Sequence, residues 1–188
     1  MVGKAELEDL SGSFNPNLKF EDFSKKFLLK LMAEWQWAWL IMAGSWYDAI
    51  KKRCGAETAN ACEEEAWVTV GERVNPRYAK IGNIELNTVV DSLKAIQLPL
   101  DNTVSRLFPV KYEIKNPNDV IVTITDCLSL QFFERKAQER IFPVCHQVEG
   151  PTMEKYLVNP KIKVTALKLP PRKSPSDIAC QWEFKLEE

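Results

Sequence analysis

Apolar residues in the first half of the chain recur every three to four positions, which is the spacing of one helical face. This spacing predicts a long first helix over about residues 20–53, a second over 56–74 and a third over 85–97. Pro76 ends or kinks the second helix and Pro99 stops the third, because proline lacks the backbone N–H that a helix requires.

After residue 109 the period changes from about 3.6 to 2, which marks a change from helices to strands. Residues 110–114 alternate apolar with charged, the letters NPND at 116–119 predict a turn, and VIVTITDC predicts the paired strand. Two more strands are predicted at KIKVTALKL and IACQWEFKL, after a short helix over 129–140. FPVCHQVEG, residues 142–150, is predicted to be an extended connection, followed by a helical turn at 151–157.

The pattern as a whole predicts an α+β protein, with N-terminal helices packed on a four-stranded, mainly antiparallel sheet. We expect a flexible arm over 1–19 and a single domain over 20–188, with a helical half at 20–109 and a sheet half at 110–188. Five residues of the last strand share one face, so Cys180 should point into the core; they are Ile178, Cys180, Trp182, Phe184 and Leu186.

The stretch WQWAWLIMAGSWY, residues 35–47, is apolar around the whole circumference of its helix and must be covered. Its own domain covers it, or a second subunit does. A homodimer with at least one of Trp37, Leu40 and Trp46 in the interface is one interpretation. In the alternative, the N-terminal arm and the loop 98–109 cover it within one chain.

Charge and length narrow the possible partners. The 25 basic and 26 acidic residues are interspersed, so no basic stripe is present to bind nucleic acid or an anionic membrane. The uncharged run at 35–47 is shorter than the ~20 apolar residues that a bilayer requires. The first residues carry no apolar segment of a secretory signal, which predicts a cytoplasmic protein.

Candidate chemistry centres on Cys145 and on His146, which is the single histidine in the sequence. Neighbouring residues of an extended chain project to opposite faces, so the two are badly placed to act as nucleophile and base. A hydrogen-bonded or solvated loop histidine is the favoured interpretation. The run Glu63–Glu65 is interpreted as a solvated helix face rather than as paired catalytic carboxylates.

Five cysteines without a CxxC pair indicate reduced thiols rather than a disulfide framework. Cys127, Cys145 and Cys180 each lie at or near the sheet and could therefore converge. With a Glu or His they would form a zinc site. Burial as small apolar residues and a reactive thiol are the alternatives, and zinc is possible but not favoured because no local cysteine pair is present.

The strings TDCLSLQFFERKAQERIFPVC and NPKIKVTALKLPPRKSPSDIACQWEF resemble the C-terminal half of an uncharacterised bacterial and archaeal protein family. With LKLMAEWQWAWLIMAGSWYDAIKKRCGAETA and EAWVTVGER, the resemblance covers about residues 20–186. The order of cysteines, strands and helix also resembles the 4-vinyl-reductase domain and L-2-amino-thiazoline-4-carboxylate hydrolase-like proteins. The family often has two more cysteines before its Pro-Pro pair, where this chain has Ala166 and Leu169, which disfavours a mononuclear zinc site.

Two functions are compatible with these features. The first is a cytoplasmic module that binds a small apolar or aromatic molecule in a pocket between helices and sheet, an interior that the 4-vinyl-reductase resemblance implies. Its candidate lining residues are Trp35, Trp39, Trp46, Cys127, Cys145, Cys180 and Trp182. The second, implied by the other resemblance, is a hydrolase of a small sulfur or nitrogen heterocycle that acts through a cysteine or a metal.

Overall fold

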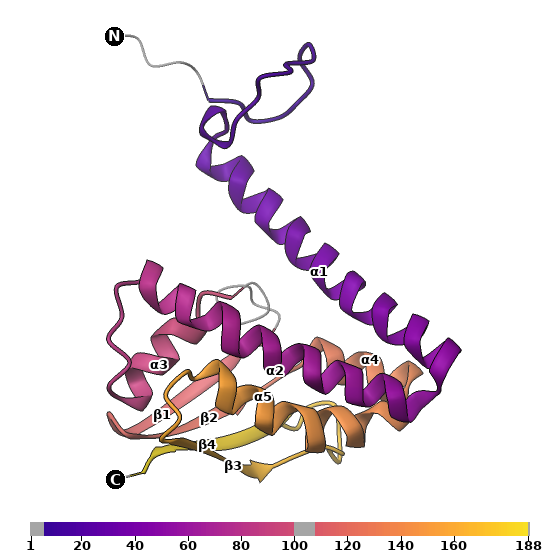
Figure 1. Cartoon of the computed structure of the whole chain (residues 1–188), viewed down its shortest axis with the longest axis vertical. Coiled ribbons are helices and arrows are strands. Elements are labelled where there is room, and N and C mark those ends of the chain that lie inside the picture. The colour runs from indigo at the N-terminus through magenta and orange to yellow at the C-terminus, as the bar shows by residue number, and fades with distance from the viewer. Residues whose placement is uncertain (1–5, 100–107, 188) are drawn as a thin grey trace. The chain divides into compact units, whose positions relative to one another are not determined.

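The computed structural model describes residues 6–99 and 108–187 (Figure 1). The chain divides into two compact units, residues 1–44 and 45–188. The single-domain interpretation of residues 20–188 stays a prediction, and most of the loop 98–109 lies outside the described residues. No helix within the two described ranges is long and apolar enough to cross a membrane.

The first unit is built around the start of the long helix α1, Lys25–Cys54, which is preceded by the short 3-10 helix η1, Phe20–Asp22. The arm turns back onto this start. The Leu7 amide donates to the Asp22 carbonyl at 2.8 Å, and the Ser24 amide donates to the Leu7 carbonyl at 3.0 Å. The Phe23 and Phe27 rings stack with centroids 4.5 Å apart. Leu7 is therefore tied to residues 22–24, at the N-terminus of α1.

In the second unit, Gly55 separates the end of α1 from α2, Ala56–Ile81. Its φ of 89° is a conformation that glycine adopts without strain. Of the two expectations for Pro76, an end or a kink, the end is wrong, because α2 continues to Ile81 with the proline inside it. Tertiary contacts offset the lost backbone hydrogen bond: Asn75, next to the proline, is buried and donates from Nδ2 to the Tyr156 carbonyl at 2.8 Å.

Helix α3, Val89–Ile96, begins four residues later than the expected start at residue 85. Its first turn is capped by Thr88, whose Oγ1 accepts from the Asp91 amide at 3.1 Å. A threonine in extended conformation satisfies an amide that the first turn leaves without a partner, so the helix starts after it. The apolar spacing at 85–88 belongs to the chain that leads into this cap.

The sheet has the order β1-β2-β4-β3, and every neighbouring pair is antiparallel. Its strands are β1 Val110–Asn116, β2 Asp119–Ile124, β3 Ile162–Lys168 and β4 Cys180–Leu186. Trp182 in β4 stands opposite Val122 of β2 and Ala166 of β3. The predicted α+β class with a four-stranded antiparallel sheet is confirmed.

One face of this sheet forms the core, with α3 and α5 (Glu149–Tyr156) against it and α2 packed on them (Figure 1). The apolar alternation of the strands supplies its inner residues. The central cluster is Val89, Leu93, Val120, Val122, Leu157, Ile162, Trp182 and Phe184. Cys180 packs against this cluster, as predicted. The other face is polar: Lys115 pairs with Glu183 at 2.7 Å across it.

The segment 142–150 is helical, so the expected extended connection is wrong. After α4, Leu128–Lys136, and the 3-10 helix η3, Gln138–Arg140, a π-helix η4 spans Pro143–Val148 and leads directly into α5. Pro143 is the first residue of η4, and the two residues before it are already helical. Cys145 and His146 therefore lie on a helix.

Candidate functional site

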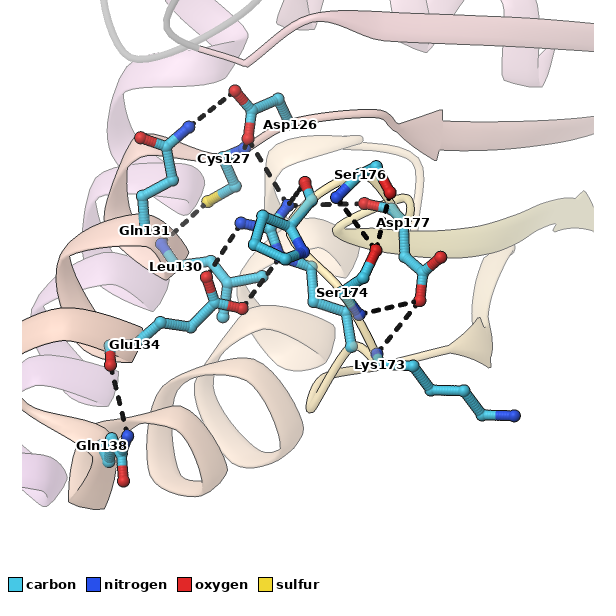
Figure 2. Close-up of polar contacts among 12 residues, drawn as sticks. Asp126, Cys127, Leu130, Gln131, Glu134, Gln138, Lys173, Ser174, Ser176 and Asp177 are labelled. Atoms are coloured by element: carbon cyan, nitrogen blue, oxygen red, sulfur yellow. Dashed lines mark hydrogen bonds and ion pairs between the residues drawn. The ribbon is translucent and has the colours of Figure 1, made fainter.

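Three segments position the cysteines that the sequence singles out. Cys127 is the N-cap of α4, and its Sγ accepts from the Leu130 amide at 3.3 Å (Figure 2). Cys145 lies in the middle of η4. Cys180 opens β4, and the Trp182 indole donates to its Sγ at 3.2 Å.

These three thiols, here called the thiol cluster, lie close enough to affect one another's ionisation. All three are half-buried. Burial raises the pKa of Cys127 to about 11 and that of Cys180 to about 12, and it raises the pKa of Cys145 further still. The charge of Glu149 acts in the same direction on each thiol. The cluster is therefore uncharged near neutral pH.

The thiol cluster is also the candidate metal site of the sequence. Within residues 6–99 and 108–187, no group of three or more His, Cys, Asp or Glu side chains is arranged to hold a metal ion. Zinc at Cys127, Cys145 and Cys180, which the sequence leaves possible but does not favour, gains no support from these residues.

His146 holds η4 against the loop that precedes β4. Its Nε2 lies 2.6 Å from the Pro170 carbonyl oxygen, which only accepts, so Nε2 carries the proton and donates. The ring also stacks on Phe142, with centroids 4.9 Å apart. Cys145 and His146 do not point to opposite faces of an extended chain, because consecutive helical residues point about 100° apart. The hydrogen bond expected for His146 is present.

Arg172 fixes the same loop to α4. Its Nε and Nη2 donate to the two carboxylate oxygens of Glu134, both at 2.8 Å, and its Nη1 donates to the Pro175 carbonyl at 3.1 Å. The side chain is only 3% exposed. A paired, bidentate guanidinium of this kind holds a planar geometry firmly. The loop is thus clamped beside the thiol cluster.

Two carboxylates, Asp126 and Asp177, also hold the loop that Arg172 binds (Figure 2). The Gln131 amide donates to Asp126 at 2.7 Å and, with the Cys127 amide and Arg172, lowers the pKa of the Asp126 carboxyl. Within the loop, Asp177 accepts from the backbone amides of residues 173 and 174. Asp126 therefore stays ionised, and its contacts join α4, the Cys127 amide and Arg172 of the loop.

The structure brings together four of the seven predicted lining residues: Cys127, Cys145, Cys180 and Trp182. Trp182 is 3% exposed and belongs to the core. Trp35, Trp39 and Trp46 lie on α1 instead and are 44%, 41% and 64% exposed. Trp35 and Trp39 belong to the first unit, so their place in a common pocket stays a prediction.

Arg140 is a second buried arginine, and it was not among the residues predicted from the sequence. Both Nη2 contacts of Arg140 go to Glu63, at 2.5 and 2.6 Å, and the guanidinium lies 3.6 Å from the Tyr47 ring centroid. The interpretation of Glu63 as part of a solvated face is therefore wrong. Its position four residues after the buried Ala59 was the available signal, because residues four apart share a helix face.

A surface cleft of about 300 Å³ lies elsewhere in the second unit. The Lys155–Glu72 ion pair, 2.9 Å long, is part of its wall. Its lining residues are Glu72, Pro76, Glu154, Lys155, Val158, Pro160 and Ile162. None of them was among the candidate site residues.

Comparison with known proteins identifies a family but no activity. No curated protein matches the chain. A trafficking protein particle complex subunit 3 from Naegleria fowleri, solved covalently bound to palmitic acid, is similar over 87% of this chain and 98% of its own, at 12% identity and a TM-score of 0.45. It is neither a 4-vinyl-reductase nor a thiazoline hydrolase. A family model described as a family of unknown function, DUF6125, matches residues 21–186, so the chain belongs to this uncharacterised family.

Proposed function

We propose that the chain is a cytoplasmic binding module that takes a small apolar or aromatic molecule at the thiol cluster beside Trp182. The observation that carries the proposal is the meeting of three uncharged, half-buried thiols from three distant segments at the edge of the core. Uncharged thiols are small, polarizable and apolar, so the surface that they offer favours a neutral ligand over an ion.

The surroundings of the cluster support a binding role. Cys145 lies on a π-helix, a rare element that occurs frequently at functional sites. The elements that carry the thiols are held by directional contacts from His146 and Arg172 rather than by apolar packing alone. Rigid elements with a preformed geometry are typical of sites that bind small molecules.

The alternative hydrolase lacks comparable support. A nucleophilic cysteine requires a thiolate near neutral pH, and burial raises the pKa of all three clustered thiols away from that range. His146, the single histidine in the sequence, donates a hydrogen bond from Nε2 to a backbone carbonyl. Neither feature activates a cysteine.

The test is a titration of the full chain with N-phenyl-1-naphthylamine, a neutral aromatic dye whose fluorescence rises in apolar surroundings. We expect saturable binding at one site per chain. Cys145→Asp introduces a charge into the cluster and should weaken binding at least tenfold, whereas Cys62→Asp, at an exposed cysteine, should leave it unchanged. Thermal melts establish that each variant is folded.

Cys145→Ser serves as a second variant of nearly unchanged size, expected to weaken binding severalfold. A Trp39→Glu/Met42→Glu variant separates the cluster from the exposed apolar side chains of α1. If this variant abolishes dye binding while both Cys145 variants bind like the wild type, the proposal is wrong. Absence of saturable binding by the wild type also contradicts it.

A further inference from the structure

The surface cleft of the second unit, here called the α2–α5 cleft, is bounded by two helices that pack against each other (Figure 1). Of its lining residues, Glu72 and Pro76 lie on α2, and Glu154 and Lys155 lie on α5. The other three belong to the chain 158–162 that leads into β3. Its volume of about 300 Å³ is at the lower end of the range for small-molecule sites.

Hydrogen bonds between distant residues fix the walls of the cleft. Asn75 Nδ2 donates to the Tyr156 carbonyl at 2.8 Å, which joins α2 to α5. Gly71 allows the close approach of the two helices, because a Cβ there would lie 2.5 Å from the Tyr156 ring. In the turn after α5, Asn159 Nδ2 donates to the Leu86 carbonyl at 3.0 Å. The cleft is therefore preformed, as is typical of sites that bind small molecules.

Val158, which lines the cleft, has a strained backbone. Its φ of 66° lies in the left-handed region, which a β-branched residue rarely adopts because its Cβ crowds the following carbonyl. The residue follows the last turn of α5, a position that glycine commonly occupies. Glycine would relieve the strain but remove an apolar side chain from the wall of the cleft. Strain of this kind is concentrated at ligand sites.

The charges of the lining favour a cation. Glu72 and Lys155 neutralise each other in an ion pair of 2.9 Å. Glu154 is the third charged residue of the lining. Within residues 6–99 and 108–187, Glu154 takes part in no ion pair. The lining therefore has a net charge of one negative unit, located at Glu154.

A backbone acceptor on α2 adds to this preference. Pro76 has no N–H to donate to the Glu72 carbonyl four residues earlier, so this carbonyl lacks its helical donor. Both residues line the cleft. A primary ammonium group has three N–H donors, so one such group can donate to a carboxylate and to a carbonyl together.

We propose that the α2–α5 cleft binds a small primary amine with a short apolar tail. The ammonium group donates to the Glu154 carboxylate and to the Glu72 carbonyl, and the tail packs on Val158 and Pro160. This site is separate from the thiol cluster and does not depend on the ligand proposed there.

Isothermal titration calorimetry of the full chain with tryptamine tests the proposal, because the primary amine of tryptamine is protonated at neutral pH, as that of lysine is. We expect saturable binding of one molecule per chain with a Kd below about 1 mM. The neutral analogue 3-ethylindole has the same ring but no ammonium group. It should bind at least about tenfold more weakly, because a charge-assisted hydrogen bond is lost.

Matched variants locate the binding site. Glu154→Gln should weaken tryptamine binding at least about tenfold, whereas Glu65→Gln, at an exposed position of α2 outside the cleft, should leave it unchanged. Val158→Gly should weaken binding severalfold and yet raise the melting temperature, because the strain is removed. A purely structural role of Val158 predicts no loss of binding.

Cys145→Asp, which alters the thiol cluster, should leave tryptamine binding unchanged and so separates the two sites. Absence of saturable tryptamine binding overturns the proposal, as does equal affinity for tryptamine and 3-ethylindole. Wild-type affinity in Glu154→Gln or in Val158→Gly overturns it as well. Tryptamine binding that is lost in Cys145→Asp and retained in Glu154→Gln would assign the ligand to the thiol cluster and contradict the proposal.

Discussion

The tryptophans of β4 and α1 differ in how far they are buried. In β4, Trp182 is 3% exposed, whereas Trp37 in α1 is 50% exposed. The strand alternates apolar and polar residues, so one face is fixed as the inner face before any packing is known. Around residues 35–47 of α1 every side is apolar, and no polar face directs the helix. Burial thus follows the contrast between faces, not the number of apolar residues.

The largest expected difference between the two elements comes from removing their tryptophans. Trp182→Ala leaves a cavity in the core beside Val122 and should lower the free energy of unfolding by about 3–5 kcal/mol. Trp37→Ala removes an exposed side chain and should change it by less than about 0.5 kcal/mol. Urea denaturation of both variants measures the difference, and equal losses would contradict the contrast between the two elements.

The second largest expected effect comes from breaking the buried ion pair between Glu63 and Arg140. Glu63→Gln leaves the mostly buried Arg140 guanidinium without its counter-charge, which should cost about 2–3 kcal/mol of unfolding free energy. Glu65→Gln, at an exposed position two residues later, is the matched control and should be near neutral. Denaturation curves at neutral pH compare the two. A harmless Glu63→Gln would mean that the pair does not secure η3 to α2.

Two helical glycines sharpen the comparison between the units. A Cβ at Gly71 in α2 would lie 2.5 Å from the Tyr156 ring, so Gly71→Ala should destabilise the chain by about 2 kcal/mol through overpacking. A Cβ at Gly44 in α1 meets nothing within 4 Å, and Gly44→Ala should stabilise by about 0.5 kcal/mol. Opposite signs are the expected result of thermal or urea unfolding; equal signs would contradict it.

The smallest effect is the pH dependence of the thiol cluster. Its thiols have raised pKa values when folded, so their contribution to the unfolding free energy is fully present well below the ordinary thiol pKa of 9.0. It begins to fall as the pH approaches 9.0 and is lost as the pH rises through about 11 to 12. Raising the pH from 7 to 9 should remove about 1 kcal/mol of unfolding free energy in total. Replacing Cys127, Cys145 and Cys180 by alanine should abolish this fall in unfolding free energy between pH 7 and 9. The control Cys54→Ala/Cys62→Ala should retain it.

The regular parts of the fold were predictable because each depends on local contrast. The alternation in β1 to β4 predicted the sheet, and the inward position of Cys180 followed from it. The convergence of Cys127, Cys145 and Cys180 was also predictable, since each cysteine stands at or near a strand. These features follow from the spacing of apolar residues along the sequence and from the order of the strands.

The rest depends on contacts between distant residues that no local pattern encodes. Arg172 and Arg140 are buried only because Glu134 and Glu63 meet them across the fold. The π-helix at 143–148 was missed because its two bounding features, Pro143 and Gly150, resemble those of a loop. Similarly, Pro76 stays inside α2 because Asn75 is anchored to α5. Tertiary contacts override local preference at each of these positions.

The central claim is that Cys127, Cys145 and Cys180 form one half-buried apolar site, and iodoacetamide labelling of the native chain at pH 8 tests it most directly. Mass spectrometry should find the exposed Cys54 and Cys62 labelled first. Cys127, with a pKa of about 11, should react about 100-fold more slowly than a thiol of pKa 9.0 because less of it is ionised. N-phenyl-1-naphthylamine should slow labelling of the three clustered cysteines further and leave the two exposed ones unchanged. Equal rates at all five cysteines, or a dye effect that does not distinguish the two groups, would contradict the account.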